Sequence, residues 1–112
     1  MEVPANQTYT FRGGLWHKFW GGANWPFGIL KISPEVIVLR DTSMNQEYQL
    51  SKSDVVKIEM RKYLGLIGCR VKISHNRKDY SDSWNGDSFI FGSLGSSLDR
   101  VAAIFRKCGW LQ

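Results

Sequence analysis

The spacing of the hydrophobic residues changes once along this chain of 112 residues, close to residue 96. Before that point apolar and polar residues alternate, most clearly in 55–63 and 69–74, which predicts β-strands that each bury one face. Beyond it, apolar residues recur at helical intervals, which predicts one amphipathic helix. The apolar stripe of this helix consists of Leu98, Val101, Ala102, Phe105 and Cys108. Short strands followed by a single C-terminal helix are therefore expected.

The ends of the helix are marked by capping signals. Ser96 and Asp99 resemble a capping box with the shorter acid, which predicts the helix start. Gly109 is a natural residue to stop the helix, because glycine tolerates the left-handed conformation found just after a helix end.

Further strands are indicated by β-branched residues between turn residues. The segment FGILKISPEVIVLR predicts two strands, Ile29–Ile32 and Val36–Leu39, joined by a tight turn at Ser33-Pro34-Glu35. Shorter strands are expected around Tyr48–Leu50 and Ser88–Phe91. Six or seven short strands and one helix predict bent antiparallel sheets, a sandwich or partial barrel with a gap that the helix covers. The length fits one domain over residues 1–112, with a core of about 7–110.

The two alternating segments predict which side chains face outward. In the first segment Val56, Ile58 and Met60 are expected to point inward, which leaves Lys57, Glu59 and Arg61 outside. In the second, the inward residues are expected to be Cys69, Val71 and Ile73, and the outward ones Arg70, Lys72 and Ser74. If the segments pair as a hairpin, Glu59 lies opposite either Arg70 or Lys72.

The aromatic stretch FRGGLWHKFWGGANWPFG, from Phe11 to Gly28, combines five glycines with three tryptophans. Its glycines, among them Gly13, Gly14, Gly21 and Gly22, are expected to let a first strand pair bend at a barrel corner. Three aromatic residues flank a predicted GGAN turn, and some of them are expected to form an exposed apolar tip. They are Trp20, Trp25 and Phe27.

Positive charge is concentrated in one part of the chain. The net charge is +5, and residues 57–78 alone carry seven basic side chains against one acid, Glu59. Such a face attracts phosphate groups of lipid or nucleic acid, although it also serves as a solvated face that keeps a protein soluble. The basic residues are Lys57, Arg61, Lys62, Arg70, Lys72, Arg77 and Lys78.

Neither catalysis nor metal binding is indicated by the reactive residues. His17 and His75 belong to no nucleophile or metal motif, and Ser74 and His75 point to opposite faces if both lie in a strand. Cys69 and Cys108 have no metal-ligand spacing and are expected to be buried thiols. We therefore expect no enzyme, no cofactor, no metal and no small-molecule substrate. The sequence carries no secretion signal or membrane-spanning run, so a cytoplasmic location is expected, with peripheral membrane association left open.

Three segments in a fixed order resemble a pleckstrin-homology-like domain, most closely the GRAM domains and small bacterial proteins of that superfold. They are PFGILKISPEVIVL, YQLSKSDVVKIEM and DSFIFGSLGSSLDRVAAIFRKCG, and the match covers Phe11 to Trp110. The resemblance implies a bent seven-stranded sandwich capped by a helix, without catalysis. Lys18 and Lys31 are the residues that fit the family's phosphoinositide signature, but the segment FWGGANWPFGIL between them departs from it because it contains no Lys or Arg.

The resemblance and the residues together predict a non-catalytic binding module. It is expected to contact a protein, a second copy of itself in a homo-oligomer, or an anionic membrane. Single-stranded nucleic acid, held by the basic segment and exposed aromatics, is the alternative. The basic and aromatic stretches are separate in sequence, which does not favour that alternative.

Overall fold

The computed structural model describes residues 7–18, 21–62, 68–80, 88–93 and 97–111, with the backbone alone described for residues 17–18 and 21–26. Within these ranges seven strands form one antiparallel sheet in the order β4-β3-β2-β1-β7-β6-β5. The strands are β1 (Tyr9–Lys18), β2 (Gly21–Ile32), β3 (Val36–Asp41), β4 (Gln46–Ser51), β5 (Val55–Lys62), β6 (Cys69–His75) and β7 (Ser88–Ser93). A 3-10 turn, η1 (Lys78–Tyr80), follows β6, and helix α1 (Leu98–Lys107) ends the fold.

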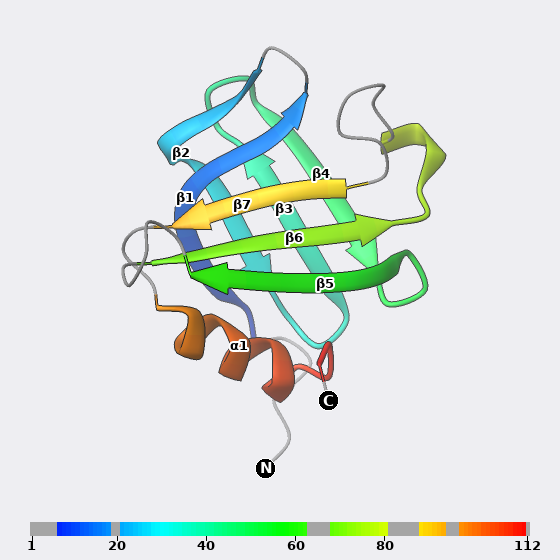
Figure 1. Ribbon diagram of the computed structural model, residues 1–112. Coiled ribbons are helices and arrows are strands. Elements are labelled where there is room, and N and C mark those ends of the chain that lie inside the picture. The colour runs from blue at the N-terminus through cyan, green and yellow to red at the C-terminus, as the bar shows by residue number, and fades with distance from the viewer. Residues whose placement is uncertain (1–6, 19–20, 63–67, 81–87, 94–96, 112) are drawn as a thin grey trace.

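The sheet is folded over, so that β2, β3 and β4 form a layer behind β7, β6 and β5, and α1 lies across one end (Figure 1). Strand β1 joins the layers, because it pairs with β2 along most of its length while Gly14, Leu15 and Trp16 also pair with β7. The predicted fold class, mainly β and bent antiparallel with one C-terminal helix, is confirmed. None of the helices in the described ranges is long and apolar enough to cross a membrane.

The predicted corner at Gly13 and Gly14 is present. The ladder between β1 and β2 shifts register after the Gly13–Gly28 pair, which is the signature of a bulged, bent strand. A Cβ atom on Gly28 would lie 2.7 Å from the backbone nitrogen of Leu15, so only glycine fits between the two strands. The backbones cross closely here because neither strand carries a side chain at the contact.

The predicted GGAN turn is wrong. Gly21 pairs with Lys18 and Gly22 with Trp16, so these glycines lie within β2. Glycine pairs favour turns through their conformational freedom, but here ladder hydrogen bonds beside the bulged corner hold them extended.

The core fills the space between the two layers and beneath the helix. Phe89, Phe91 and Phe105 are its largest fully buried side chains. Cys69 and Cys108 are buried free thiols, as expected, and burial raises the pKa of Cys69 to about 11. The other core residues come from every layer, as the alternation predicts, and include Leu15, Leu30, Ile32, Ile37, Leu39, Leu50, Val71, Ile73 and Val101.

One predicted inward residue faces the solvent. Val56 is 66% exposed, whereas Ile58 and Met60 pack against the core as expected. The β5–β6 ladder shifts register between Val55 and Lys57, so Val56 is the extra residue of a bulge. The alternation therefore begins one residue later than the sequence suggests.

Both helix ends are capped, although the N-terminal cap differs from the prediction. The cap is Ser97 rather than Ser96, and its side chain accepts a hydrogen bond from the backbone N–H of Arg100. The third helical residue is thus Arg100, so Asp99 cannot complete a reciprocal capping box. At the other end Gly109 has φ +82°, and the N–H of Trp110 donates to the carbonyl of Phe105, a Schellman motif that confirms the predicted stop.

The residues after the helix fasten it to the sheet. The indole Nε1 of Trp110 donates to the carbonyl of Ser33 at 2.7 Å, and Lys52 Nζ donates to the carbonyl of Cys108 at 3.0 Å. The Lys52 ammonium also lies 5.4 Å from the centre of the Trp110 ring. These contacts tie the chain beyond α1 to the β2–β3 and β4–β5 turns.

Candidate functional site

The outward residues of β5 and β6 form rows across the ladder. Glu59 pairs with Lys72 and Arg61 with Arg70, which settles the register that the sequence left open. Directly opposed residues point to the same face of a sheet. The inward partners alternate with them, and Cys69, Val71 and Ile73 are buried as predicted.

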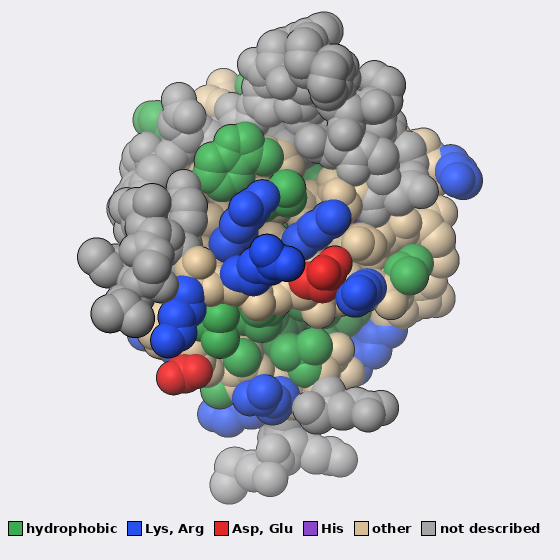
Figure 2. Space-filling model, in the orientation of Figure 1, with side chains coloured by type: hydrophobic (Ala, Val, Ile, Leu, Met, Phe, Trp, Pro, Cys, Tyr) green, Lys and Arg blue, Asp and Glu red, His purple; other side chains and the backbone are tan. Residues whose placement is uncertain are grey.

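Four of these outward cations make up what we call the basic face: Lys57, Arg61, Arg70 and Lys72. All four are exposed, and Figure 2 shows basic side chains gathered around an acidic one at the centre of the visible surface. Three of the cations and Glu59 line a hollow of about 200 Å³. The basic face is therefore a concave, positively charged patch.

Glu59 lies close to the lysines, and among the described residues the arginines have no counter-ion. Lys57 Nζ is 3.9 Å from a carboxylate oxygen of Glu59, and Lys72 is the direct cross-strand neighbour of that residue. Within the part of the chain that the structure describes, no ion pair or hydrogen bond holds the side chain of Arg61 or Arg70. Like charges directly opposite each other in a sheet are destabilising, so the Arg61–Arg70 pair destabilises the folded protein in the absence of an anion.

Apolar side chains continue the row of Lys72. Ile90 on β7 pairs with Lys72, and Trp16 on β1 pairs with Ile90, so the three point to the same side of the sheet. Trp16 is 39% exposed and Ile90 is partly exposed. The fold thus places an indole beside the basic face, and Trp16 was not among the contact residues predicted from the sequence. Alternation in the first strand was the available signal, because Leu15 faces inward and its neighbour must face outward.

The other predicted contact residues lie elsewhere or outside the described residues. Lys62 pairs with Cys69, whose side chain is buried, so Lys62 is on the opposite face of the strand from Arg61. Phe27 is 49% exposed on β2, where its carbonyl accepts a hydrogen bond from the backbone of Thr42. The placement of Trp20 and of the Trp25 side chain lies outside the described residues.

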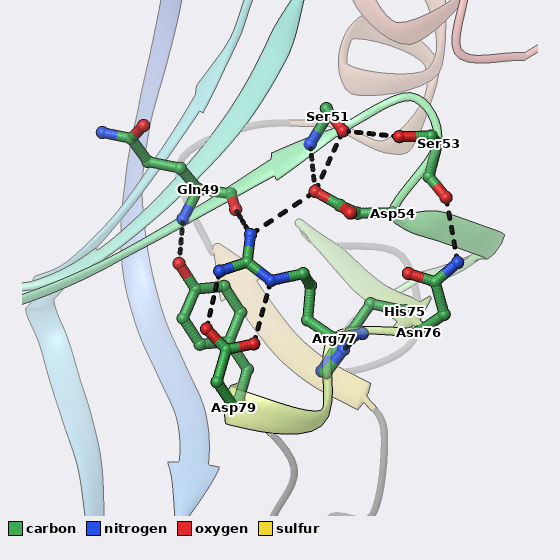
Figure 3. A network of polar contacts seen from close by, with 9 residues as sticks. Gln49, Ser51, Ser53, Asp54, His75, Asn76, Arg77 and Asp79 are labelled. Carbon is green, nitrogen blue, oxygen red and sulfur yellow. Dashed lines mark hydrogen bonds and ion pairs between the residues drawn. The ribbon is translucent and has the colours of Figure 1, made fainter.

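Arg77 and Lys78, predicted at the end of the basic segment, lie after β6 and not on the basic face. Arg77 is held between two carboxylates, with Nη2 2.6 Å from Asp79 and Nη1 3.5 Å from Asp54 (Figure 3). Lys78 is exposed at the start of η1. The basic segment of the sequence is therefore divided into a face with unpaired arginines and a paired arginine at another position.

The contacts around Arg77 also occupy the free edge of β4. Gln49 donates its backbone N–H to the hydroxyl of Tyr80, and its carbonyl accepts from Arg77 (Figure 3). We call this group, with Asp54 and Asp79, the polar seam. Side chains here occupy backbone groups that an edge strand would otherwise present to another chain.

The carboxylates of the polar seam are electrostatically stabilised. Hydrogen bonds from the backbone N–H and hydroxyl of Ser51 are the largest cause of the lowered pKa of Asp54, and the charge of Arg77 adds to them. The Arg77 guanidinium is the main cause of the lowered pKa of Asp79. Both carboxylates are therefore held in the charged form by their partners.

The histidine and serine of β6 do not meet. His75 is buried, stacks on Phe89 and accepts a hydrogen bond at Nδ1 from the backbone N–H of Arg77. Ser74 points to the outer face, in the row of Lys57. Among the residues described, no group of histidine, cysteine, aspartate and glutamate side chains is arranged to hold a metal ion. The chemistry that the basic face offers is the binding of anions.

Comparison with known protein families and with curated protein sequences finds no match to this chain. The interpretation of the site accordingly depends on its own geometry and charge.

Proposed function

We propose that this protein is a non-catalytic binding module with pleckstrin-homology-like architecture that associates peripherally with anionic membrane surfaces. The observation that carries the proposal is the opposition of Arg61 and Arg70 across the β5–β6 ladder with no acid between them. A sheet that keeps such a pair loses stability, and an external anion removes the repulsion. The fold supports the same proposal, since seven antiparallel strands and a terminal helix are the architecture that the family resemblance implies.

The apolar neighbours of the basic face favour a membrane over other anionic surfaces. Indole side chains are enriched at the membrane–water interface, where the ring contacts both apolar and polar groups. Each basic side chain near an anionic surface contributes roughly 1 kcal/mol, so the four cations of the basic face supply several kcal/mol at low salt. Trp16 and Ile90 lie in the row of Lys72, where they would enter the headgroup region together with it.

Vesicle co-sedimentation tests this function. The protein is mixed with neutral phosphatidylcholine vesicles and with vesicles that also contain phosphatidylglycerol, at low salt and at about 150 mM salt, where surface charges are screened beyond roughly 8 Å. We expect binding that requires the anionic lipid and weakens as salt rises. The variant Arg61→Glu/Lys72→Glu should lose it, whereas the matched control Arg106→Glu/Lys107→Glu on α1 should keep most of it. Absence of binding to every anionic vesicle would refute the proposal.

A second candidate, single-stranded nucleic acid, is favoured by the position of Trp16. The aromatic and basic stretches are separate in sequence, yet the fold sets Trp16 two ladder steps from Lys72. Base stacking on an aromatic ring beside cations is the usual recognition mode for single strands. A labelled oligonucleotide added to the vesicle assay distinguishes membrane binding from nucleic-acid binding. If the protein binds the oligonucleotide more tightly than the vesicles, and Trp16→Ala removes that binding, the nucleic-acid function replaces the membrane proposal.

A further inference from the structure

The hollow in the basic face contains a defined charge arrangement. Three cations and one carboxylate line it, which leaves a net charge of +2. Glu59 lies beside Lys57 and opposite Lys72, so its negative charge offsets the lysines. The positive potential is thereby concentrated at Arg61 and Arg70, which have no partner among the described residues.

Two glycines flank the arginine row. Arg70 pairs on its other side with Gly92 of β7, and Gly92 pairs with Gly14 of β1. Two glycines in register contribute no side chain beside the guanidinium of Arg70. Both glycines are buried, and Glu59 and Lys72 border the arginines in the adjoining row of the ladder.

From this arrangement we infer that the hollow binds one terminal phosphate group, a phosphate monoester, and discriminates against phosphodiesters. A monoester carries a charge of about −1.5 to −2 at neutral pH, which matches the charge of the hollow, whereas a diester carries only one negative charge. Guanidinium groups donate two parallel hydrogen bonds to phosphate oxygens, and two of them facing one hollow require several free oxygens on the same phosphorus. The inference rests on the proposed function and names the headgroup chemistry that it selects.

Glu59 limits how strongly anions bind to the basic face. Its carboxylate repels anions that approach over the lysines, and this repulsion grows with the charge of the anion. The variant Glu59→Gln should therefore strengthen binding to both kinds of anionic surface, and to monoester surfaces at least as much as to phosphodiester surfaces.

Vesicles with equal surface charge provide the test. One set contains phosphatidic acid, a monoester, and the other contains phosphatidylglycerol, a diester, at about twice the mole fraction to equalise charge. We expect monoester vesicles to bind about ten-fold more tightly, the effect of one or two additional charge-assisted hydrogen bonds. Arg61→Gln/Arg70→Gln should remove this difference, and Arg106→Gln/Lys107→Gln should preserve it.

A conservative variant separates hydrogen-bond geometry from charge. Arg61→Lys/Arg70→Lys keeps both positive charges but loses the planar guanidinium groups. Binding to phosphatidylglycerol should stay within about two-fold of the wild type. The ratio of the affinity for monoester vesicles to that for diester vesicles should fall most of the way to one. Circular dichroism on each variant verifies that the sheet is intact. A full monoester preference in the lysine variant would overturn the role given to the guanidinium groups.

The source of the phosphate is distinguished by a soluble probe. Glycerol 3-phosphate is titrated against the protein without vesicles, and the side-chain NMR signals of Arg61 and Arg70 are followed. Specific shifts without any preference among vesicles would support the monoester site and assign it to a soluble ligand. Equal binding to both anionic vesicles with no response to glycerol 3-phosphate would overturn the inference and leave the proposed function standing. Failure to bind any anionic vesicle would instead refute the proposed function.

Discussion

The basic face and the polar seam contain the same kinds of side chains in opposite arrangements. At the seam, Arg77 is shared between Asp54 and Asp79 and also donates to a backbone carbonyl of β4. On the basic face, Arg61 and Arg70 oppose each other and have no partner among the described residues. One arginine closes the edge of the sheet, whereas the other two leave their hydrogen-bonding capacity unused.

The difference indicates which charges serve the fold and which serve binding. A charge whose donors are all occupied by the protein stabilises the folded chain but has little left to offer a ligand. A charge that is repelled by its neighbour weakens the fold and gains most when an anion arrives. The sequence alone treats residues 57–78 as one basic segment, and only the ladder separates these two roles.

The largest effect is expected when Arg70 on the basic face is given a partner of opposite charge. Arg61→Glu places a carboxylate directly opposite Arg70, so binding to anionic vesicles should fall about 30-fold, because two charge units are worth roughly 2 kcal/mol near a membrane. The free energy of unfolding should rise by a few tenths of a kcal/mol to about 1 kcal/mol. Urea unfolding and vesicle co-sedimentation measure the two effects. Loss of both stability and binding would show that Arg61 supports the sheet.

A smaller effect is expected from the aromatic neighbour of the basic face. Trp16→Ala removes a half-exposed indole, which should weaken vesicle binding about five-fold, or roughly 1 kcal/mol, and leave the salt dependence unchanged. Trp16→Phe is the control, because it keeps an apolar ring at the same place in the row. An unchanged affinity for Trp16→Ala would restrict the contact surface to the cations.

At the polar seam, the expected effect is on stability alone. Tyr80→Phe keeps the ring that packs beside Tyr48 and Phe89 but removes the hydroxyl that accepts from Gln49 at 3.3 Å. The free energy of unfolding should fall by about 0.5–1 kcal/mol, the usual contribution of a single hydrogen bond. Vesicle affinity should match that of the wild type. A parallel loss of affinity would mean that the seam and the basic face are coupled.

The stability of the protein should depend on pH through the carboxylates of the polar seam. Because their pKa values are lowered in the folded protein, Asp54 and Asp79 stabilise it above their ordinary value of 3.8, and this contribution is lost as the pH falls below that value. Urea unfolding at pH 6 and pH 3 should show the decrease, and Asp79→Asn should show a smaller one. If Asp79→Asn loses as much stability as the wild type on acidification, the ion pair with Arg77 contributes little.

Periodicity was sufficient to predict most of the fold. The alternation in 69–74 correctly separated Arg70 and Lys72 from their buried neighbours, because a strand with one buried face leaves little freedom of register. It failed at Val56, where a bulge inserts one residue into β5. The GGAN turn, predicted from its glycines, was also wrong, because Gly21 and Gly22 are held in the β1–β2 ladder.

Other parts of the candidate site depend on contacts between distant segments and have no local signature. Trp16 joins the row of Lys72 only because β1 pairs with β7. Arg77 leaves the basic segment because the chain turns after β6 and brings it to Asp54 and Asp79. Sequence spacing records neither event, since both are set by how the layers close on each other.

The pairing of Trp16 with Ile90 joins positions 74 residues apart in the chain, whereas β5 and β6 are neighbours in sequence. Contacts close in sequence form quickly, while distant strand pairing must first overcome the entropy of closing a long loop. During folding Arg61 and Arg70 should therefore pair early, and Trp16 should reach its place beside the basic face later. A refolding experiment should find anion binding and the pairing of Trp16 with Ile90 recovering at different rates, so the candidate site reports when the sheet closes.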